Sequence, residues 1–158
     1  MIKHQTGVTT VEFAIVATAL FTVVFGIIEL ARVLYTWNTL NEMTRRATRV
    51  AVVCPINHSA IQRVALFNSA TDGGASAIAP GVEPENISVE YLDEYGEVMS
   101  VPMASQVAYV RVSVVNYQHK MFIPFVPQVL SAPRFATTLP RESLGYADGE
   151  SECYGTST

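Results

Sequence analysis

The sequence predicts an α+β protein in which a long N-terminal helix packs on a small antiparallel β-sheet. Three features support this fold class: an uncharged apolar run near the N-terminus, a helical pattern that continues beyond it, and alternating strand patterns after residue 86. The 158 residues suffice for one compact domain with one appendage. The hydrophobic content of 49% excludes disorder along the whole chain. A net charge of −4 argues against nucleic acid as a partner.

The apolar run predicts a transmembrane helix over residues 8–29. No charged residue occurs between Glu12 and Glu29. The 16 residues from Phe13 to Ile28 form a helix of about 24 Å, short for a hydrocarbon core of about 30 Å. A start at Val8 gives 21 residues and about 31 Å, which spans this core. Glu12 then lies within the membrane, where a carboxylate is costly and indicates a functional residue.

Two alternatives concern the processing and the orientation of this segment. A conventional secretory signal peptide is disfavoured, because apolar residues continue past the small residues 17–19. A count of flanking basic residues places the C-terminal side in the cytoplasm, since only Lys3 precedes the span. The basic residues that follow it are Arg32, Arg45, Arg46 and Arg49. Tyr35 and Trp37 fit either a membrane–water interface or packing on a soluble domain.

Residues 30–54 predict an amphipathic continuation of the same helix. Apolar and small residues recur at alternating steps of three and four, which is typical of one buried helix face. They are Leu30, Val33, Trp37, Leu40, Thr44, Ala47, Ala51 and Cys54. Pro55 ends the pattern. We therefore expect one helix of about 45 residues and about 70 Å, whose second half packs on a globular domain formed by residues 55–158.

That domain is expected to begin with a short helix and to continue as a sheet. The spacing of Ser59 and Gln62 fits a capping box, so we expect a helix over residues 59–69. Residues 68–86 have the composition of a loop. Residues 87–91 alternate like a strand, 94–97 fit a hairpin turn, and 98–101 are expected to pair back.

The clearest strand pattern covers residues 107–117. Ala108, Val110, Val112 and Val114 are expected to face the core, and Tyr109, Arg111 and Ser113 the opposite side. Residues 121–126 are apolar but are interrupted by Pro124, so they predict a loop or an edge. Residues 135–139 predict a last strand.

The N-terminal residues also resemble a known processing site. The segment from Gly7 through Glu12 to Phe13 resembles the type IV prepilin site, in which a short basic leader ends in glycine and glutamate stands fifth in the mature chain. Residues 11–14, 26–32 and 44–51 extend the similarity to TadE-like pseudopilins of the tight-adherence (Tad, or Flp) pilus system. The pilins also share the plan of a helix packed on an antiparallel sheet.

The resemblance implies that a prepilin peptidase removes the leader, residues 1–7, by cutting between Gly7 and Val8. It also implies that Glu12 meets the freed amino terminus of a neighbouring subunit in an apolar setting, where pairing offsets the cost of both charges. The expected function is that of a structural pseudopilin, or minor pilin, in assembly or initiation of a Tad pilus. The expected partners are the prepilin peptidase, other pilin-like subunits, the Tad assembly platform and the lipid bilayer.

The resemblance further implies a location and a redox environment. The leader would stay in the cytoplasm, the helix would cross the inner membrane once, and the C-terminal domain would be periplasmic or enter an extracellular pilus. Long segments translocate largely regardless of charge, which weakens the count of basic residues. Export would place Cys54 and Cys153 in an oxidising compartment, so they form either a disulfide or two independent thiols.

No pattern in the sequence indicates catalysis. His4, His58 and His119 lack metal-ligand spacing, and no nucleophile elbow, zinc-protease motif or phosphate loop occurs. We therefore expect a non-enzymatic protein without cofactor or metal. An uncleaved single-span protein that displays a periplasmic binding or adhesive domain remains the alternative. It explains the apolar run and the sheet, but it leaves Gly7 and Glu12 as coincidence.

Overall fold

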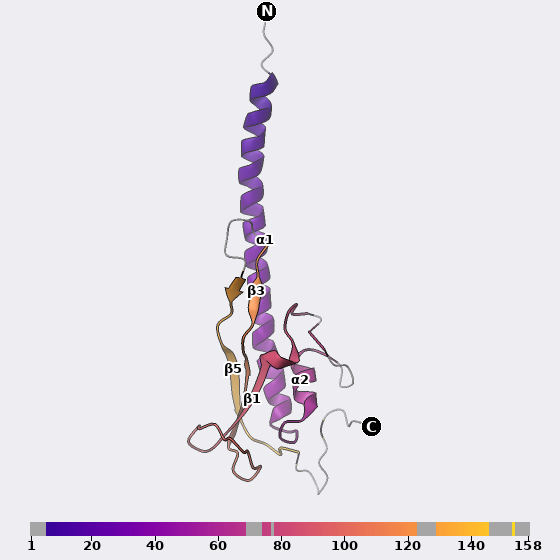
Figure 1. Cartoon of the computed structure of the whole chain (residues 1–158), viewed down its shortest axis with the longest axis vertical. Coiled ribbons are helices and arrows are strands. Elements are labelled where there is room, and N and C mark those ends of the chain that lie inside the picture. Colours follow the sequence, from indigo (N-terminus) through magenta and orange to yellow (C-terminus); the bar gives the residue numbers. More distant parts are fainter. Residues whose placement is uncertain (1–5, 69–73, 77, 123–128, 146–152, 154–158) are drawn as a thin grey trace, which may run out of the picture.

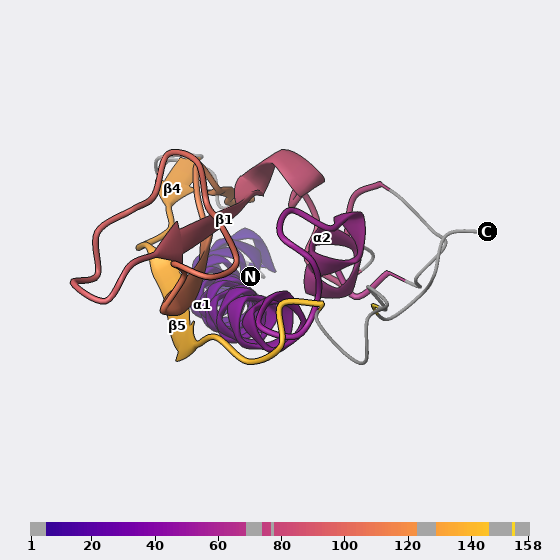
Figure 2. The ribbon, with the colours of Figure 1, turned by 90° about the horizontal axis from the view of Figure 1, so that it is seen from below.

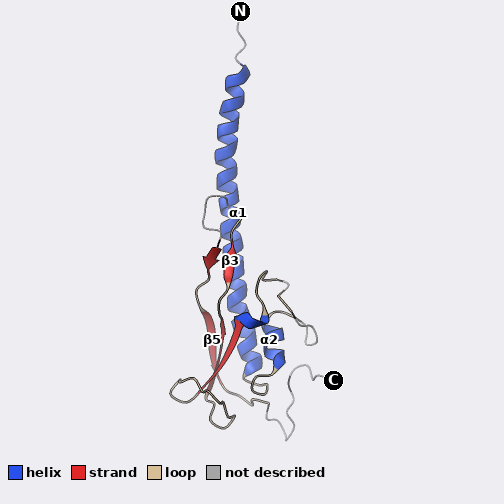
Figure 3. Cartoon of the chain, in the orientation of Figure 1, coloured by secondary structure: helices blue, strands red, loops and turns tan. Residues whose placement is uncertain are grey.

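A computed structural model describes residues 6–68, 74–76, 78–122, 129–145 and 153. Figure 1 shows one long helix, α1 (Thr6–Ala51), which projects far beyond a domain packed around its C-terminal half. At 46 residues α1 is about 69 Å long. The predicted α+β fold class is confirmed: Figure 3 shows helices on one side and antiparallel strands on the other.

The C-terminal half of α1 supplies one side of the hydrophobic core. Val33, Leu40 and Ala47 of the predicted stripe are buried, as are Thr44, Ala51 and Cys54. Leu30 is an exception, with 60% of its surface exposed, because the domain does not cover that side of the helix. Trp37 is only partly buried.

Threonines widen the buried face of α1 beyond the predicted stripe. Thr36, Thr39 and Thr48 are buried although they are polar. Their hydroxyls donate to the carbonyl four residues earlier, at 2.9, 2.9 and 2.6 Å, so the burial of these three threonines leaves none of their own donors unsatisfied. Thr44 Oγ1 also lies 2.9 Å from Thr137 Oγ1 and thereby joins the helix to the sheet.

The helix ends at Ala51, and the segment before Pro55 forms turns. A later part of the chain returns to this end: the N–H of Leu144 donates to Val52 O at 3.1 Å, and that of Gly145 to Val53 O at 2.7 Å. These bonds satisfy carbonyls that the end of a helix leaves without partners. Gly145 has a φ of 81°, and a Cβ atom there would lie 2.5 Å from Pro55 Cγ. The position therefore requires glycine.

The second helix, α2 (Ser59–Ala65), packs beside the end of α1. It differs from the prediction in two respects. Its N-cap is His58, whose Nδ1 accepts from Ala60 N at 3.2 Å, and not a Ser59 capping box. It also ends earlier, because Phe67 adopts a left-handed φ of 59°. The predicted end at residue 69 lies outside the described residues. The 3₁₀ turn η1 (Pro84–Asn86) then leads into the sheet.

A three-stranded antiparallel sheet has the order β1-β2-β5. It consists of β1 (Ile87–Leu92), β2 (Tyr109–Val114) and β5 (Phe135–Pro140), with Val112 opposite Val89 and Thr137. Figure 2, along the axis of α1, shows this sheet on one side of the helix and α2 on another. Val110, Val112 and Val114 face the core as predicted, but Ser113 is buried as well.

A second, two-stranded ribbon was not predicted. It pairs β3 (Gln118–Lys120) with β4 (Val129–Ser131), His119 lying opposite Leu130. In Figure 1 the ribbon lies along α1 above the main sheet, nearer the exposed half of the helix. Most of the segment predicted as a loop or an edge, 121–126, lies outside the described residues.

The expected return strand at 98–101 is reduced to a short antiparallel pairing around Val98. A turn does follow β1, since Gly96 N donates to Asp93 O at 3.1 Å, but only an isolated bridge joins Leu92 to Val98. Pro102 lacks an N–H group and cannot extend this ladder. β2 pairs with β1 instead.

Candidate membrane helix and assembly site

The described residues of the domain leave the N-terminal half of α1 uncovered. Between positions 7 and 28 every residue is exposed except Ala17 and Gly26, which are intermediate. Large apolar side chains cover this surface; examples are Val11, Phe13, Ile15, Val16, Leu20, Phe21, Val23, Phe25, Ile27 and Ile28. A helix that is apolar all round needs an apolar surrounding. By length and composition α1 is able to cross a membrane.

The polar groups within this half of α1 are satisfied by the helix itself. Thr18 Oγ1 donates to Ala14 O, and Thr22 Oγ1 donates to Thr18 O, both at 2.8 Å. An unsatisfied hydroxyl would be costly in hydrocarbon. These two bonds therefore make the threonines compatible with lipid.

The predicted processing site lies at the very start of α1. Gly7 and Val8 are both in the first turn, where the backbone N–H groups have no helical partners. Both are exposed, and nothing lies within 4 Å of the position a Cβ atom of Gly7 would occupy. The helix thus includes the last two residues of the predicted leader, 6 and 7; residues 1–5 lie outside the described part.

Glu12 is the one ionisable residue of α1 between Gly7 and Ile28. Its side chain is exposed on the lateral surface of the helix. Among the described residues, no hydrogen bond or ion pair reaches its carboxylate. A carboxylate in this position is available to a group from outside the chain.

The apolar half of α1 ends at a buried carboxylate, Glu29. Its side chain is only 5% exposed and pairs with Arg32 Nη1 at 2.7 Å. Its Oε1 atom accepts from the backbone N–H of Phe122 at 3.3 Å and lies 3.8 Å from His119 Nε2. The guanidinium of Arg32 stacks over the Phe122 ring at 4.5 Å. Through these contacts, β3 and Phe122 pack on α1 at the point where its apolar surface ends.

Sequence reasoning did not single out Glu29. Glu29 marks the end of the uncharged run, and this position was the only sequence signal for a functional role. Its partners, His119 and Phe122, are 90 and 93 residues further along the chain. The sequence alone does not distinguish a solvated carboxylate from a buried one.

Cys54 and Cys153 form a disulfide in the structure, with their Cα atoms 4.9 Å apart. Cys54 is fully buried just after α1. The bond holds residue 153, near the C-terminus, against the end of the helix, 99 residues away in sequence.

Two further titratable residues have structural roles. His58 caps α2, and Glu90 on β1 pairs with Arg111 at 3.5 Å and Arg134 at 3.3 Å. Within the described ranges, no group of three or more His, Cys, Asp or Glu side chains is arranged to hold a metal ion.

These features define a class of protein: an α+β domain carried on a single long apolar helix. The comparison with protein families is more specific. The family described as TadE-like protein matches residues 7–49, so the predicted resemblance to TadE-like proteins is confirmed for α1. The match covers about a quarter of the chain and supports a similarity to pilin-like proteins of the Tad pilus system. Comparisons with curated proteins and with solved structures gave no match.

Proposed function

We propose that this protein is a pseudopilin, or minor pilin, that acts in assembly or initiation of a Tad pilus. The observation that carries the proposal is the division of α1: an exposed apolar half with a single carboxylate, and a second half buried in a domain. In an isolated chain this apolar surface would face water, which is unfavourable. In the membrane, lipid would cover it, and after assembly the helices of neighbouring pilin-like subunits would do so.

The first step of the proposed pathway is removal of residues 1–7 by a prepilin peptidase. The bond between Gly7 and Val8 lies in the first turn of α1. Because this turn lacks half of its hydrogen bonds and contains glycine, opening it for cleavage costs little. The cut would leave Val8 with a free amino group and Glu12 four residues later.

The second step is insertion of the cleaved subunit beside another. Glu12, about 6 Å along the helix from Val8, would accept the amino group of the neighbouring subunit. Each charge alone in an apolar setting costs on the order of several kcal/mol. Subunits whose axial register pairs the two charges would therefore be favoured over all other registers.

In the proposed orientation α1 crosses the inner membrane, the leader lies in the cytoplasm and the domain lies in the periplasm. The disulfide between Cys54 and Cys153 fits an oxidising compartment. The prepilin peptidase, other pilin-like subunits and the Tad assembly platform would be the partners. The role would be structural and not catalytic.

The insertion step is tested by replacing Glu12 with Gln, which removes the charge of the side chain and keeps its shape. We expect the variant to be processed normally but to enter pilin-like assemblies poorly, as measured by cross-linking to neighbouring subunits and by pilus yield. Thr9→Ala, an exposed polar change three residues earlier on the same helix, is the control. Normal assembly of the Glu12→Gln variant would contradict the assigned role of Glu12.

The second candidate is an uncleaved single-span protein that displays a binding domain. The exposed loop after β1 favours it, because Tyr95 and Val101 are 90% and 74% exposed there. Under this alternative, replacing Tyr95 and Val101 would abolish adhesion. Removing the prepilin peptidase would leave adhesion unchanged.

A further inference from the structure

We propose that an open cavity beside α1 binds the headgroup of a membrane phospholipid that carries a phosphate and a primary ammonium group. The cavity lies between α1, residues 78–83 and β3. Arg32 and Lys120 would hold the phosphate, and Glu83 the ammonium group. The proposal rests on α1 spanning a membrane, as in the proposed function, but it holds for either orientation of the helix.

The depth of the cavity along α1 matches the headgroup layer. Residues 8–28 cover about 31 Å, the thickness of the hydrocarbon core. Ile28, the last residue of this apolar run, lines the cavity, and so does Arg32 one turn later. Arg32 therefore lies about 6 Å beyond the hydrocarbon boundary. The headgroup layer on each side of a bilayer is about 5–8 Å thick.

The size and the walls of the cavity suit a headgroup with the first part of its acyl chains. Its volume is about 980 Å³, at the upper end of the range for small-molecule sites. Ile28, Ile78 and Phe122 provide apolar walls, and Phe122 is 76% exposed although it is a large aromatic residue. A phospholipid in contact with the apolar half of α1 would reach this cavity without leaving the bilayer.

Two cations, Arg32 and Lys120, line the cavity. The Arg32 guanidinium is fixed between the Glu29 carboxylate and the Phe122 ring. Arginine has five N–H donors, so pairing with Glu29 leaves others free, and the side chain is 41% exposed. Lys120 is exposed, and within the described part of the chain it has no ion pair.

The balance of charge favours a zwitterionic headgroup over an anionic one. Glu29 offsets the charge of Arg32, and the wall of the cavity carries one further cation, Lys120, and one further carboxylate, Glu83. A headgroup with both charges leaves neither Lys120 nor Glu83 unmatched. A glycerol headgroup would offer Glu83 no cation, and a choline headgroup would offer it no N–H donor.

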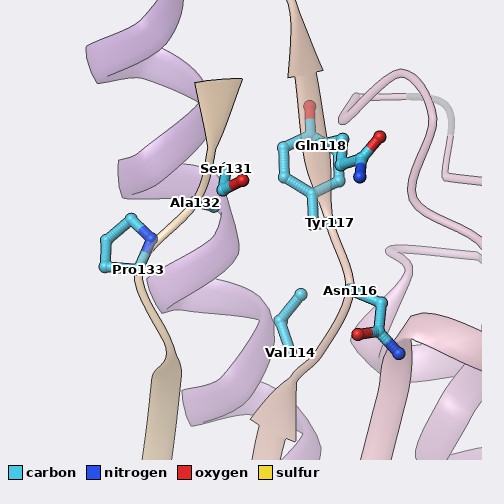
Figure 4. Close-up of a pocket in the computed structure, with 7 residues that line it drawn as sticks. All are labelled: Val114, Asn116, Tyr117, Gln118, Ser131, Ala132 and Pro133. Carbon is cyan, nitrogen blue, oxygen red and sulfur yellow. The ribbon is translucent and has the colours of Figure 1, made fainter. Parts of the chain in front are cut away.

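Tyr117 connects the two walls of the cavity. Its hydroxyl donates to Pro80 O at 3.3 Å, which links β3 to the segment 78–83. Burial raises the pKa of this hydroxyl above its ordinary value of 10.0, and the neighbouring Thr36 and Arg32 side chains oppose the shift. Figure 4 shows Asn116, Tyr117 and Gln118 in a smaller neighbouring hollow, which shares these residues with the cavity.

The proposal is tested on the full, uncleaved chain in nanodiscs made of equal parts phosphatidylethanolamine and phosphatidylcholine. Native mass spectrometry after release counts the lipids that each protein retains. We expect the natural sequence to retain the ethanolamine lipid preferentially. Lys120→Gln should weaken retention of both lipids about tenfold, as loss of one charge-assisted contact implies. Glu83→Gln should abolish only the preference between them.

Matched controls are Arg45→Gln and Glu97→Gln, which remove the same charges at exposed positions outside the cavity. Equal retention of the two lipids by the natural sequence, or variants indistinguishable from these controls, would overturn the proposal. So would equally tight binding of glycerophosphoethanolamine, which has the headgroup without acyl chains and would identify a soluble ligand. The nanodisc experiment requires neither the peptidase nor a pilus. A negative result in the processing or assembly tests therefore does not bear on the lipid-binding proposal. Failure of the chain to insert would overturn both proposals.

Discussion

Replacing Leu40 by Ala should destabilise the domain strongly, whereas Leu30→Ala should leave its stability unchanged. Both leucines belong to the stripe predicted from sequence, but Leu40 is fully buried and Leu30 is 60% exposed. Removing the extra carbon atoms of Leu40 costs about 2.4 kcal/mol of transfer free energy. The cavity left behind raises the total to about 3–4 kcal/mol. For a chain of this size the melting temperature should fall by about 6–16 °C.

The assay is thermal unfolding of the full chain in detergent micelles, followed by tryptophan fluorescence. Trp37 is the only tryptophan and packs against the core, so its emission reports unfolding of the domain. Leu30→Ala serves as the matched control on the same helix. Similar melting temperatures for the two variants would refute the placement of the domain around α1, as would a loss below about 1 kcal/mol for Leu40→Ala.

Three further predictions concern the end of α1. Gly145→Ala should lower the melting temperature, because its Cβ atom would clash with Pro55 and its φ is positive; an unchanged melting temperature would contradict the turn geometry. Cys54→Ser should destabilise the oxidised protein by about 4–5 kcal/mol in the chain-entropy model, and Cys153→Ser should match it; a reductant should remove the difference in denaturant midpoint from the natural sequence. Burial raises the pKa of Tyr91 above 10.0, opposed by its hydrogen bond from a backbone N–H, so unfolded chains lose this proton first and stability should fall above pH 10; Tyr91→Phe should flatten that slope, and an unchanged slope would refute the assignment.

The sequence predicts best where one physical signal dominates. The apolar run and the absence of proline determine α1, and the alternation of Val110, Val112 and Val114 determines β2. Thr36, Thr39 and Thr48 on the buried face were missed, because their burial depends on hydrogen bonds to the preceding turn of the helix. The ribbon of β3 and β4 was missed as well, since strands of three residues are too short to show an alternating pattern.

The candidate site also contains residues that the sequence indicates and contacts that only the structure shows. Gly7, Val8 and Glu12 are local in sequence, and together with the apolar run that follows them they resemble a prepilin processing site. The contacts of Glu29 and the cavity beside Arg32 depend on β3, which is about 90 residues away and reaches the helix only after the domain folds. No local pattern encodes such a contact, so it had to come from the structure.

The most direct test of the account is the N-terminus of the mature protein. Intact mass and N-terminal sequence would be measured on membrane-extracted protein, from cells with and without the prepilin peptidase. The account predicts a chain that begins at Val8 when the peptidase is present and at Met1 when it is absent. A chain that begins at Met1 in both would contradict the pilin pathway and favour an uncleaved anchored domain.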